Sequence, residues 1–418
     1  MTRPADKLRI DPDRLWATLM ETAVFGATAR GGLCRLALSA EDAAVRRWFV
    51  AACEAAGCTV TVDELGDIFA RRAGADPTLP PIAIGSHLDT QPTGGRFDGI
   101  LGVLAGLEIV RTLNDSEIVT RHPIEVVDWT NEEGARFAPA MLASGVFAGA
   151  FGADYARDRA DRDGVTFEAA LQAVGFKGPH PAGDHPLAAH FELHIEQGPV
   201  LEDAGMEIGV VTGVQGIVWL DVEIAGLACH AGTTPMGLRR DALQGAARLA
   251  QAVDAVGRAD PGVSLSTIGV FEAYPGSRNT VPERVRMTVD LRHPRVEGLE
   301  RMEAEFRAAA AEIAAALGLD IAVTPVWSSP PVVFAADCVD AVRQAAARLG
   351  YSRRDIVSGA GHDSVYVSRV APTGMIFVPC QDGISHNEAE AITPTQAAAG
   401  ADVLLHAVLA FDRGDDVA

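Results

Sequence analysis

Apolar and polar positions follow two different periods along this chain, and the period changes from one segment to the next. A helical period marks residues 11–24 and 41–56, whereas short apolar runs at 81–84 and 122–129 have the length of strands buried in a sheet. Further helices are expected at 100–110, 167–174, 337–349 and 393–411, and further strands at 59–62, 68–72, 190–197 and 373–379. This order predicts an α/β domain with a mixed sheet flanked by helices.

The segment from residue 213 to residue 327 has a pattern of its own. It predicts, in order, a strand, a helix, two strands, a helix and a strand, at 217–224, 241–256, 264–273, 283–292, 296–317 and 320–326. This β-α-β-β-α-β order is typical of a ferredoxin-like fold. Because a chain of 418 residues is too long for a single core, we expect two domains, one formed by residues 1–212 and 328–418 and one inserted at 213–327.

Two polar residues occupy special positions around the strand at 81–84. His87 follows the strand, and Asp98 precedes the apolar helix at 100–110. Open α/β sheets build their sites at the carboxyl ends of strands, where an imidazole and a carboxylate can bind a divalent metal ion, with Asp89 orienting His87. The alternative is a loop histidine without a ligand and an aspartate that caps the helix.

More candidate ligands follow other predicted strands. Glu132 and Glu133 come after the strand at 122–129, and one of two adjacent acids can bind metal while the other acts as a general base. Alternation at 190–197 places His194 on one face together with Glu192 and Glu196, which fits either a metal site or a solvated edge strand. With His386 near the C-terminus, these residues predict two divalent ions per chain, Zn²⁺ or else Mn²⁺, Co²⁺ or Ni²⁺.

Composition narrows the class of partner. The formal net charge of −21 argues against a nucleic acid or an anionic membrane surface as a partner. The apolar stretches are too short and interrupted to span a membrane, and the N-terminus lacks the apolar region of a secretory signal. Six cysteines without C-x-x-C spacing give no disulfide framework or zinc knuckle. A cytoplasmic location is therefore expected.

Eight motifs occur in order: G-S-H-L-D-T, G-G-R-F-D-G-I-L-G-V, N-E-E-G-A-R-F, E-L-H-I-E-Q-G, C-H-A-G-T-T-P-M, S-R-N-T-V-P, D-L-R-H and G-I-S-H-N-E. Through them the chain resembles the amidase/hydantoinase–carbamoylase family, from about residue 15 to residue 411. That family includes N-carbamoyl-L-amino-acid hydrolases, β-ureidopropionases and allantoate amidohydrolases among the aminoacylase-like dinuclear metallopeptidases. The resemblance implies a dinuclear catalytic domain, an inserted lid and dimerisation domain, and a homodimer.

The resemblance also implies residue roles. It makes Glu132 the general base that activates the attacking water. The implied metal ligands are His87, Asp98, Glu133, His194 and His386, with Asp98 shared by both ions.

On the substrate side, Gln197 matches a family position near the substrate, and Asn279 and Arg292 match residues that hold its carboxylate. His230 matches a histidine that stabilises the tetrahedral oxyanion, typically in the site of a neighbouring subunit. Without the resemblance, Arg292 fits an ordinary surface salt bridge, and His230 fits a capping or core histidine. The glycines around His362 allow either a close approach to a ligand or a simple turn.

The expected activity is therefore hydrolysis of the carbamoyl C–N bond of N-carbamoyl-L-amino acids, small ureido substrates that carry a carboxylate. Allantoate amidohydrolase and β-ureidopropionase are the alternatives within the enzyme class, because they share the same metals, base and carboxylate clamp. An aminopeptidase is less compatible with Arg292, which provides for a substrate carboxylate. A metal-free ligand-binding protein is the alternative outside the enzyme class, and it is disfavoured because every ligand position and Glu132 are filled.

Overall fold

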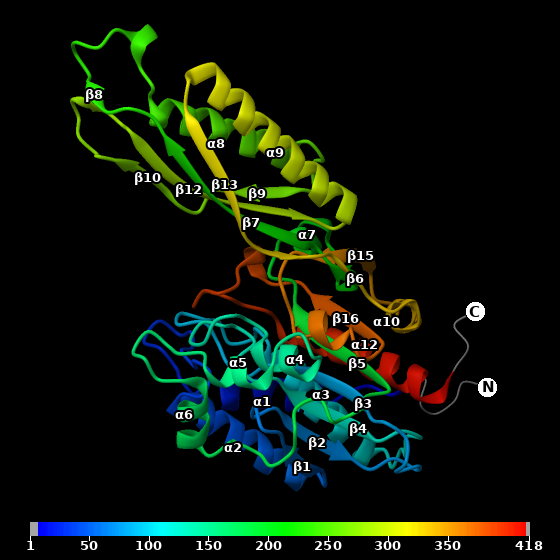
Figure 1. The fold of residues 1–418 in the computed structure, drawn as a ribbon. Helices are drawn as coiled ribbons and strands as arrows, with labels where there is room; N and C mark the ends of the chain where they lie inside the picture. The colour runs from blue at the N-terminus through cyan, green and yellow to red at the C-terminus, as the bar shows by residue number, and fades with distance from the viewer. Residues whose placement is uncertain (1–6, 415–418) are drawn as a thin grey trace. The chain divides into compact units, whose positions relative to one another are not determined.

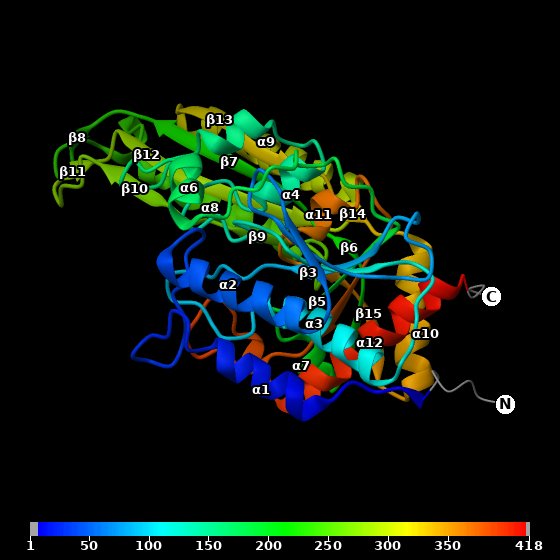
Figure 2. The same ribbon diagram turned by 90° about the horizontal axis from the view of Figure 1, so that it is seen from below.

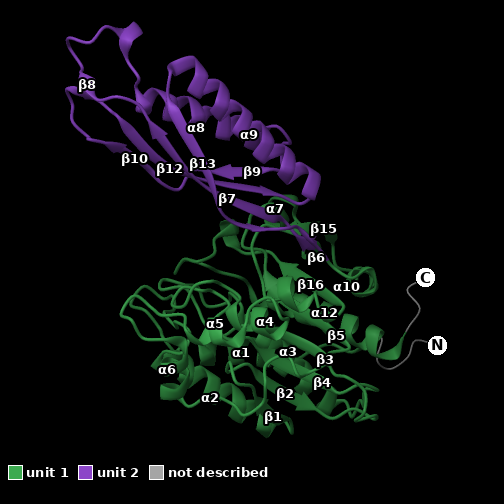
Figure 3. Cartoon of the chain, viewed as in Figure 1, with its two compact units in different colours: residues 1–212, 334–418 green, residues 213–333 purple. Residues whose placement is uncertain are grey.

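The computed structural model describes residues 7–414. They form two compact units, unit 1 from residues up to 212 and from 334 onwards, and unit 2 from residues 213–333 (Figure 3). Unit 2 extends beyond the predicted end at residue 327 because its last long strand continues to Ser329 and a short strand follows at Val332–Val333. Residues 1–6, which contain part of the N-terminus considered for a secretory signal, lie outside the described residues.

Unit 1 is an α/β unit with a mixed sheet, as predicted (Figure 1). Its strands are β1 (Thr59–Val62), β2 (Ile68–Arg72), β3 (Ile82–Ser86), β4 (Ile124–Asp128), β5 (Ala189–Ile195), β6 (Ile208–Val214), β15 (Arg353–Ser358) and β16 (Thr373–Val378). Its helices are α1 (Pro12–Thr22), α2 (Ala40–Ala55), α3 (Ile100–Asp115), α4 (Leu142–Phe147), α5 (Ala153–Arg157), α6 (Phe167–Val174), α7 (Val200–Ala204), α10 (Ala336–Leu349), α11 (Ser364–Val367) and α12 (Pro394–Arg413), with a 3₁₀ turn η3 at Gln381–Gly383.

The strand order in this sheet is β1-β2-β4-β3-β5-β16-β6, followed by the short strand β14 (Val332–Val333) antiparallel to β6, and β15 also pairs with β6. The central strands β4, β3, β5 and β16 run parallel, whereas β1, β2 and β6 pair antiparallel with their neighbours. The carboxyl ends of the parallel strands therefore meet at one edge of the sheet. Helices α3 and α12 cover one face of this sheet, and α4 and α11 lie on the other (Figure 2).

Strand β5 corrects one expectation from the sequence. Every residue of β5 is buried between β3 and β16, so the solvated-edge interpretation is wrong. The strand also ends at Ile195, so Glu196 lies just outside it. Its carboxylate accepts hydrogen bonds from the amides of Val200 and Leu201, at 2.8 and 2.7 Å, in the first turn of α7.

Unit 2 has an antiparallel sheet with both long helices on one face (Figure 1). Its elements are β7 (Gly216–Ala225), β8 (Cys229–His230), η2 (Met236–Leu238), α8 (Ala242–Arg258), β9 (Leu265–Thr267), β10 (Phe271–Tyr274), β11 (Thr280–Val281), β12 (Arg284–His293), α9 (Val296–Leu317), β13 (Asp320–Ser329) and β14 (Val332–Val333). The order is β10-β12-β7-β13, with β9 also on β12. Alternate residues of β7 and β12, such as Val222 and Met287, pack with Leu249 and Phe306 of the two helices in one core.

The expected strand at 264–273 is divided into β9 and β10. Thr267 pairs with Asp290 and Phe271 with Met287, so four steps along one chain face three along β12. The extra residue makes a bulge, and the Val270 amide donates to the Thr288 hydroxyl at 3.1 Å instead of to a carbonyl. No helix among residues 7–414 is both long enough and apolar enough to cross a membrane.

Candidate metal centre

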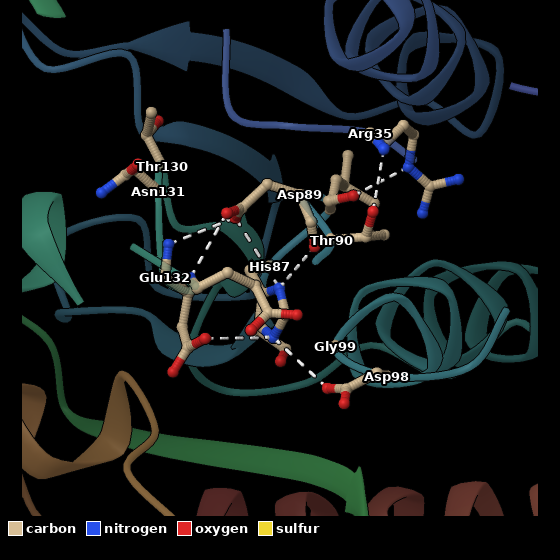
Figure 4. A network of polar contacts seen from close by, with 12 residues as sticks. Arg35, His87, Asp89, Thr90, Asp98, Gly99, Thr130, Asn131 and Glu132 are labelled. Atoms are coloured by element: carbon tan, nitrogen blue, oxygen red, sulfur yellow. Dashed lines mark hydrogen bonds and ion pairs between the residues drawn. The ribbon is translucent and has the colours of Figure 1, made fainter. Parts of the chain in front are cut away.

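His87 lies in the loop that leaves the buried strand β3 (Figure 4). Its Nδ1 is 2.9 Å from the backbone carbonyl of Asp89, which fixes the ring and directs Nε2 away from that loop. Nε2 lies 3.5 Å from Glu132 Oε2 and 3.7 Å from Asp98 Oδ1. Burial lowers the pKa of His87 to about 4, so the ring is neutral, the form in which imidazole binds metal.

Asp98 lies between two groups of side chains. Its Oδ1 is 3.1 Å from Nε2 of His194, at the end of β5, and its Oδ2 is 3.7 Å from Nε2 of His386. The N-cap of α3 is Gly99, so the interpretation of Asp98 as the helix cap is wrong. Burial opposes the charge on His194, yet the neighbouring Asp98 carboxylate raises the pKa of His194 to about 9.

The adjacent acids after β4 point in different directions. Glu132 approaches His87, and Glu133 Oε2 lies 3.3 Å from His386 Nε2. The Asp89 carboxylate accepts a hydrogen bond from the backbone amide of Glu132 at 3.2 Å (Figure 4) and one from the backbone amide of Glu133 at 3.3 Å. Asp89 therefore orients His87 through its carbonyl and the acidic pair through its carboxylate. Burial, followed by repulsion from nearby carboxylates, raises the pKa of both acids well above the ordinary value.

The ligand atoms form two groups in which the atoms lie within 4.8 Å of one another. One group is His87, Asp98 and His194, and the other is Asp98, Glu133 and His386. This mixture of imidazole nitrogen and carboxylate oxygen suits Zn²⁺ and neighbouring divalent transition metals. It also suits the charge of the site, because cations would offset the mutual repulsion of the buried carboxylates of Asp98, Glu132 and Glu133. The residues therefore fit metal ions, and Asp98 belongs to both groups.

Gln197 and Ser385 contact the shared carboxylate. Gln197 Nε2 and Ser385 Oγ donate hydrogen bonds to Asp98 Oδ2 at 2.9 and 2.7 Å. Gln197 has a positive φ of 58°, an uncommon conformation for a residue with a side chain. Its Oε1 is buried and accepts no hydrogen bond from the described residues. Sequence reasoning missed Ser385, although its position next to His386 was a signal.

A buried polar layer lies beside His194. Its neighbour Glu192 accepts hydrogen bonds from the hydroxyls of Ser86 at 2.8 Å and Ser364 at 2.6 Å, which ties β5 to β3 and α11. The ring of His362 packs edge-on against the His194 ring, with centroids 4.6 Å apart. Glu192, His194 and His362 form a third group whose possible ligand atoms lie within 4.8 Å of one another. The glycine-rich segment thus places a buried histidine next to a candidate ligand, a contact that the sequence left open.

The remaining candidates are on unit 2, where the structure brings only two of them together. His230 on β8 pairs with Thr280 on β11, and the Ala231 amide donates to the Asn279 carbonyl at 2.9 Å, so His230 and Asn279 are exposed neighbours. Arg292 is at the other end of β12, paired with Ile217 at the start of β7.

The separation within unit 2 is large. Eight residue-to-residue steps of extended strand lead from Arg284, at the end of β12 nearest Asn279, to Arg292, which corresponds to about 26 Å. Arg292 forms a two-pronged ion pair with Asp290 on its own strand, at 3.0 and 2.9 Å. Asn279 and Arg292 of one unit 2 therefore do not reach the same carboxylate.

Comparison with known proteins decides the family. A model described as Peptidase family M20/M25/M40 matches residues 83–410. The chain belongs to this family. It is 48% identical over 409 residues to N-carbamoyl-L-amino-acid amidohydrolase of Rhizobium meliloti, with 98% of each chain covered. It is 39% identical over 414 residues to N-carbamoyl-L-amino acid amidohydrolase of Geobacillus stearothermophilus, covering 97% of this chain and 100% of the relative.

A solved structure is also similar over nearly the whole chain. A crystal structure of an amidase of the hydantoinase/carbamoylase family from Burkholderia multivorans superimposes with a TM-score of 0.94 at 54% identity, covering 97% of this chain and 98% of that one. The resemblance to the amidase/hydantoinase–carbamoylase family that the motifs predicted is confirmed.

Proposed function

We propose that this M20-family protein is a metal-dependent amidohydrolase that cleaves the carbamoyl C–N bond of N-carbamoyl-L-amino acids. Water is consumed, and the products are the amino acid, CO₂ and ammonia. The observation that carries the proposal is the pair of ligand groups sharing Asp98. These two groups occur in a chain that is 48% identical, over 98% of its length, to a protein named N-carbamoyl-L-amino-acid amidohydrolase.

Two divalent ions are proposed per subunit. His87 and His194 would hold one ion and Glu133 and His386 the other, with Asp98 shared. When bound, the ions would polarise the ureido carbonyl and lower the pKa of water. Zn²⁺ fits this ligand set, as do Mn²⁺, Co²⁺ and Ni²⁺.

Glu132 is the proposed general base. Its carboxylate faces His87, and the Asp89 carboxylate holds its backbone amide. A base must reach the proton that it removes, and Glu132 is the member of the acidic pair that belongs to neither ligand group of Asp98. Glu132 would take a proton from the attacking water and return it to the departing amino nitrogen.

The substrate carboxylate and the developing oxyanion require donors. We assign Arg292 and Asn279 to the carboxylate, Gln197 to a position near the substrate and His230 to the oxyanion. The Nδ1 atom of His230 accepts a hydrogen bond from the Gly232 amide at 3.0 Å, so Nε2 carries the proton and is the donor. A preorganised donor of this kind stabilises negative charge that develops during the reaction.

A homodimer would reconcile the two ends of unit 2. Because Arg292 and Asn279 of one chain do not reach the same carboxylate, we propose that His230 and Asn279 act in the site of a second subunit, with unit 2 as a ferredoxin-like lid and dimerisation domain. The cytoplasmic location stays a prediction.

The test is ammonia release from N-carbamoyl-L-methionine, N-carbamoyl-β-alanine and allantoate by metal-reconstituted protein, compared with the same protein after a chelator. We expect hydrolysis of the first substrate, loss of activity with the chelator and recovery with Zn²⁺ or Mn²⁺. Preference for allantoate or N-carbamoyl-β-alanine would replace the proposed substrate. Full activity in chelator, with metal shown to be absent, would overturn the metal-dependent mechanism.

A further inference from the structure

Glu390 is a buried acid whose carboxylate lies against the loop that carries Asp98. It is 2% exposed and comes from the segment between η3 and α12, four residues after His386. Its Oε1 accepts hydrogen bonds from the backbone amides of Phe97 and Asp98, at 2.9 and 3.1 Å. A single carboxylate oxygen therefore holds two consecutive peptide groups of the Asp98 loop.

Gly95 shows how closely the loop wraps around this carboxylate. A Cβ atom at Gly95 would overlap the carboxyl group and Cβ of Glu390. Gly95 does not have a positive φ, so its backbone conformation alone does not require glycine. The close approach of Glu390 is therefore the physical reason for a glycine at this position.

Glu390 does not have the features of an acid that is retained for stability. Its second oxygen, Oε2, is buried and accepts no hydrogen bond from the described residues. Burial of a carboxylate with one oxygen unpaired costs free energy of folding. Such a group calls for an explanation other than packing, and its contacts point to the Asp98 loop.

We propose that Glu390 is a positioning residue that fixes Asp98 between the two ligand groups of the metal centre. The amide that Glu390 holds belongs to Asp98 itself, whose carboxylate oxygens face His194 on one side and His386 on the other. Because Glu390 and His386 lie in one short segment, the same contact sets the spacing between Asp98 and His386. This inference rests on the proposed metal centre.

The experiment is equilibrium dialysis of chelator-treated protein against Zn²⁺, with four variants. Glu390→Ala removes the carboxylate that accepts the two hydrogen bonds. Gly95→Ala keeps Glu390 in the chain, but the added Cβ would push its carboxylate away from the Asp98 loop. Glu390→Gln keeps an oxygen acceptor of the same reach. Gly152→Ala is the control, because a Cβ there meets no atom within 4 Å and its φ is −79°.

We expect Glu390→Ala and Gly95→Ala each to weaken Zn²⁺ binding by about 10- to 100-fold, the usual effect of losing a partner that orients a metal ligand. Glu390→Gln and Gly152→Ala should bind Zn²⁺ as the wild type does. A merely structural role would lower the melting temperature without this rescue by glutamine. If Glu390→Ala does not fold, the test is the Zn²⁺ affinity of Gly95→Ala compared with that of Gly152→Ala.

Two results separate the inference from the proposed function. If the wild type binds no Zn²⁺ or related ion, the proposed metal centre is wrong. If the wild type binds but Glu390→Ala and Gly95→Ala bind equally well, or if Glu390→Gln is as weak as Glu390→Ala, the positioning role is wrong while the proposed function stands.

Discussion

Replacing Gly99 by alanine should damage the metal centre through one methyl group. Gly99 is the N-cap of α3 and has φ 69° and ψ −58°. A Cβ on this backbone would lie 2.6 Å from Cδ2 of His87 and closer still to two other ring atoms. Because non-bonded carbon atoms prefer about 3.5–4.0 Å, the ring or the loop must move by about 1 Å.

The His87 ring cannot move without losing its own contacts. Its Nδ1 is held by the Asp89 carbonyl at 2.9 Å, and its Nε2 faces Glu132 and Asp98. A misplacement of about 1 Å at a reacting centre typically costs about 10²-fold in rate. The positive φ adds about 1–3 kcal/mol of strain for a residue with a side chain. We therefore expect Gly99→Ala to lose about two orders of magnitude in kcat/KM and some stability.

Gly149→Ala separates strain from collision. Gly149 has a φ of 71°, close to that of Gly99, and a Cβ there meets no atom within 4 Å. Both variants should lose stability in chemical denaturation, Gly149→Ala through backbone strain alone, but only Gly99→Ala should lose kcat/KM for ammonia release and affinity for Zn²⁺. Equal kcat/KM values in the two variants would refute the steric argument and the importance of the His87 position.

Three other outcomes are expected. Glu132→Gln should lower kcat by about 10²- to 10⁴-fold with Zn²⁺ still bound by metal analysis, and unchanged kcat would exclude Glu132 as the base. Arg292→Ala should raise KM by about 10- to 100-fold, the effect of losing a charged hydrogen bond. Arg286 is an exposed arginine of the same strand, and Arg286→Ala should leave KM unaltered. Equal KM values in the two variants would show that Arg292 does not bind the substrate carboxylate. Burial raises the pKa of Asp89 to about 8, so the folded metal-free protein binds more protons than the unfolded chain between about pH 4 and pH 8. The wild type should therefore lose stability relative to Asp89→Asn as the pH rises through that range. Denaturation curves in which the wild type gains stability instead would contradict the raised pKa of Asp89 in the folded protein.

Local pattern was enough to predict much of the fold. The helix at Phe167–Val174 and the strands at Thr59–Val62 and Ile68–Arg72 have the predicted bounds, because each combines a clear period with turn residues at its ends. Strands β6 and β15 were missed, and β9 and β10 were predicted as one strand. Their bounds depend on pairing with distant partners and, between β9 and β10, on a bulge opposite Thr288.

The sequence predicted the positions of the candidate metal ligands better than those of the candidate substrate-binding residues. His87 and Glu133 follow buried strands and His194 lies at the end of one, so strand prediction located them, and parallel pairing explains why they meet. The opposite ends that Asn279 and Arg292 occupy in unit 2 were not predicted. Their distance depends on the uninterrupted pairing of β12 with β7, which a motif does not encode.

The residues that sequence reasoning missed share a physical property. Glu390 and Ser385 lie close to 290 residues from Asp98 along the chain, and Glu390 acts on backbone amides, which leave no trace in the identity of the residues that carry them. Yet the loops that leave β3 and β4 have no regular structure to fix them, so their geometry depends on such contacts. Asp89 holds the amides of the acidic pair in the same way. The candidate ligands of this centre are thus predicted by motifs, whereas the spacing that we propose for them depends on carboxylates that accept hydrogen bonds from peptide groups across the fold.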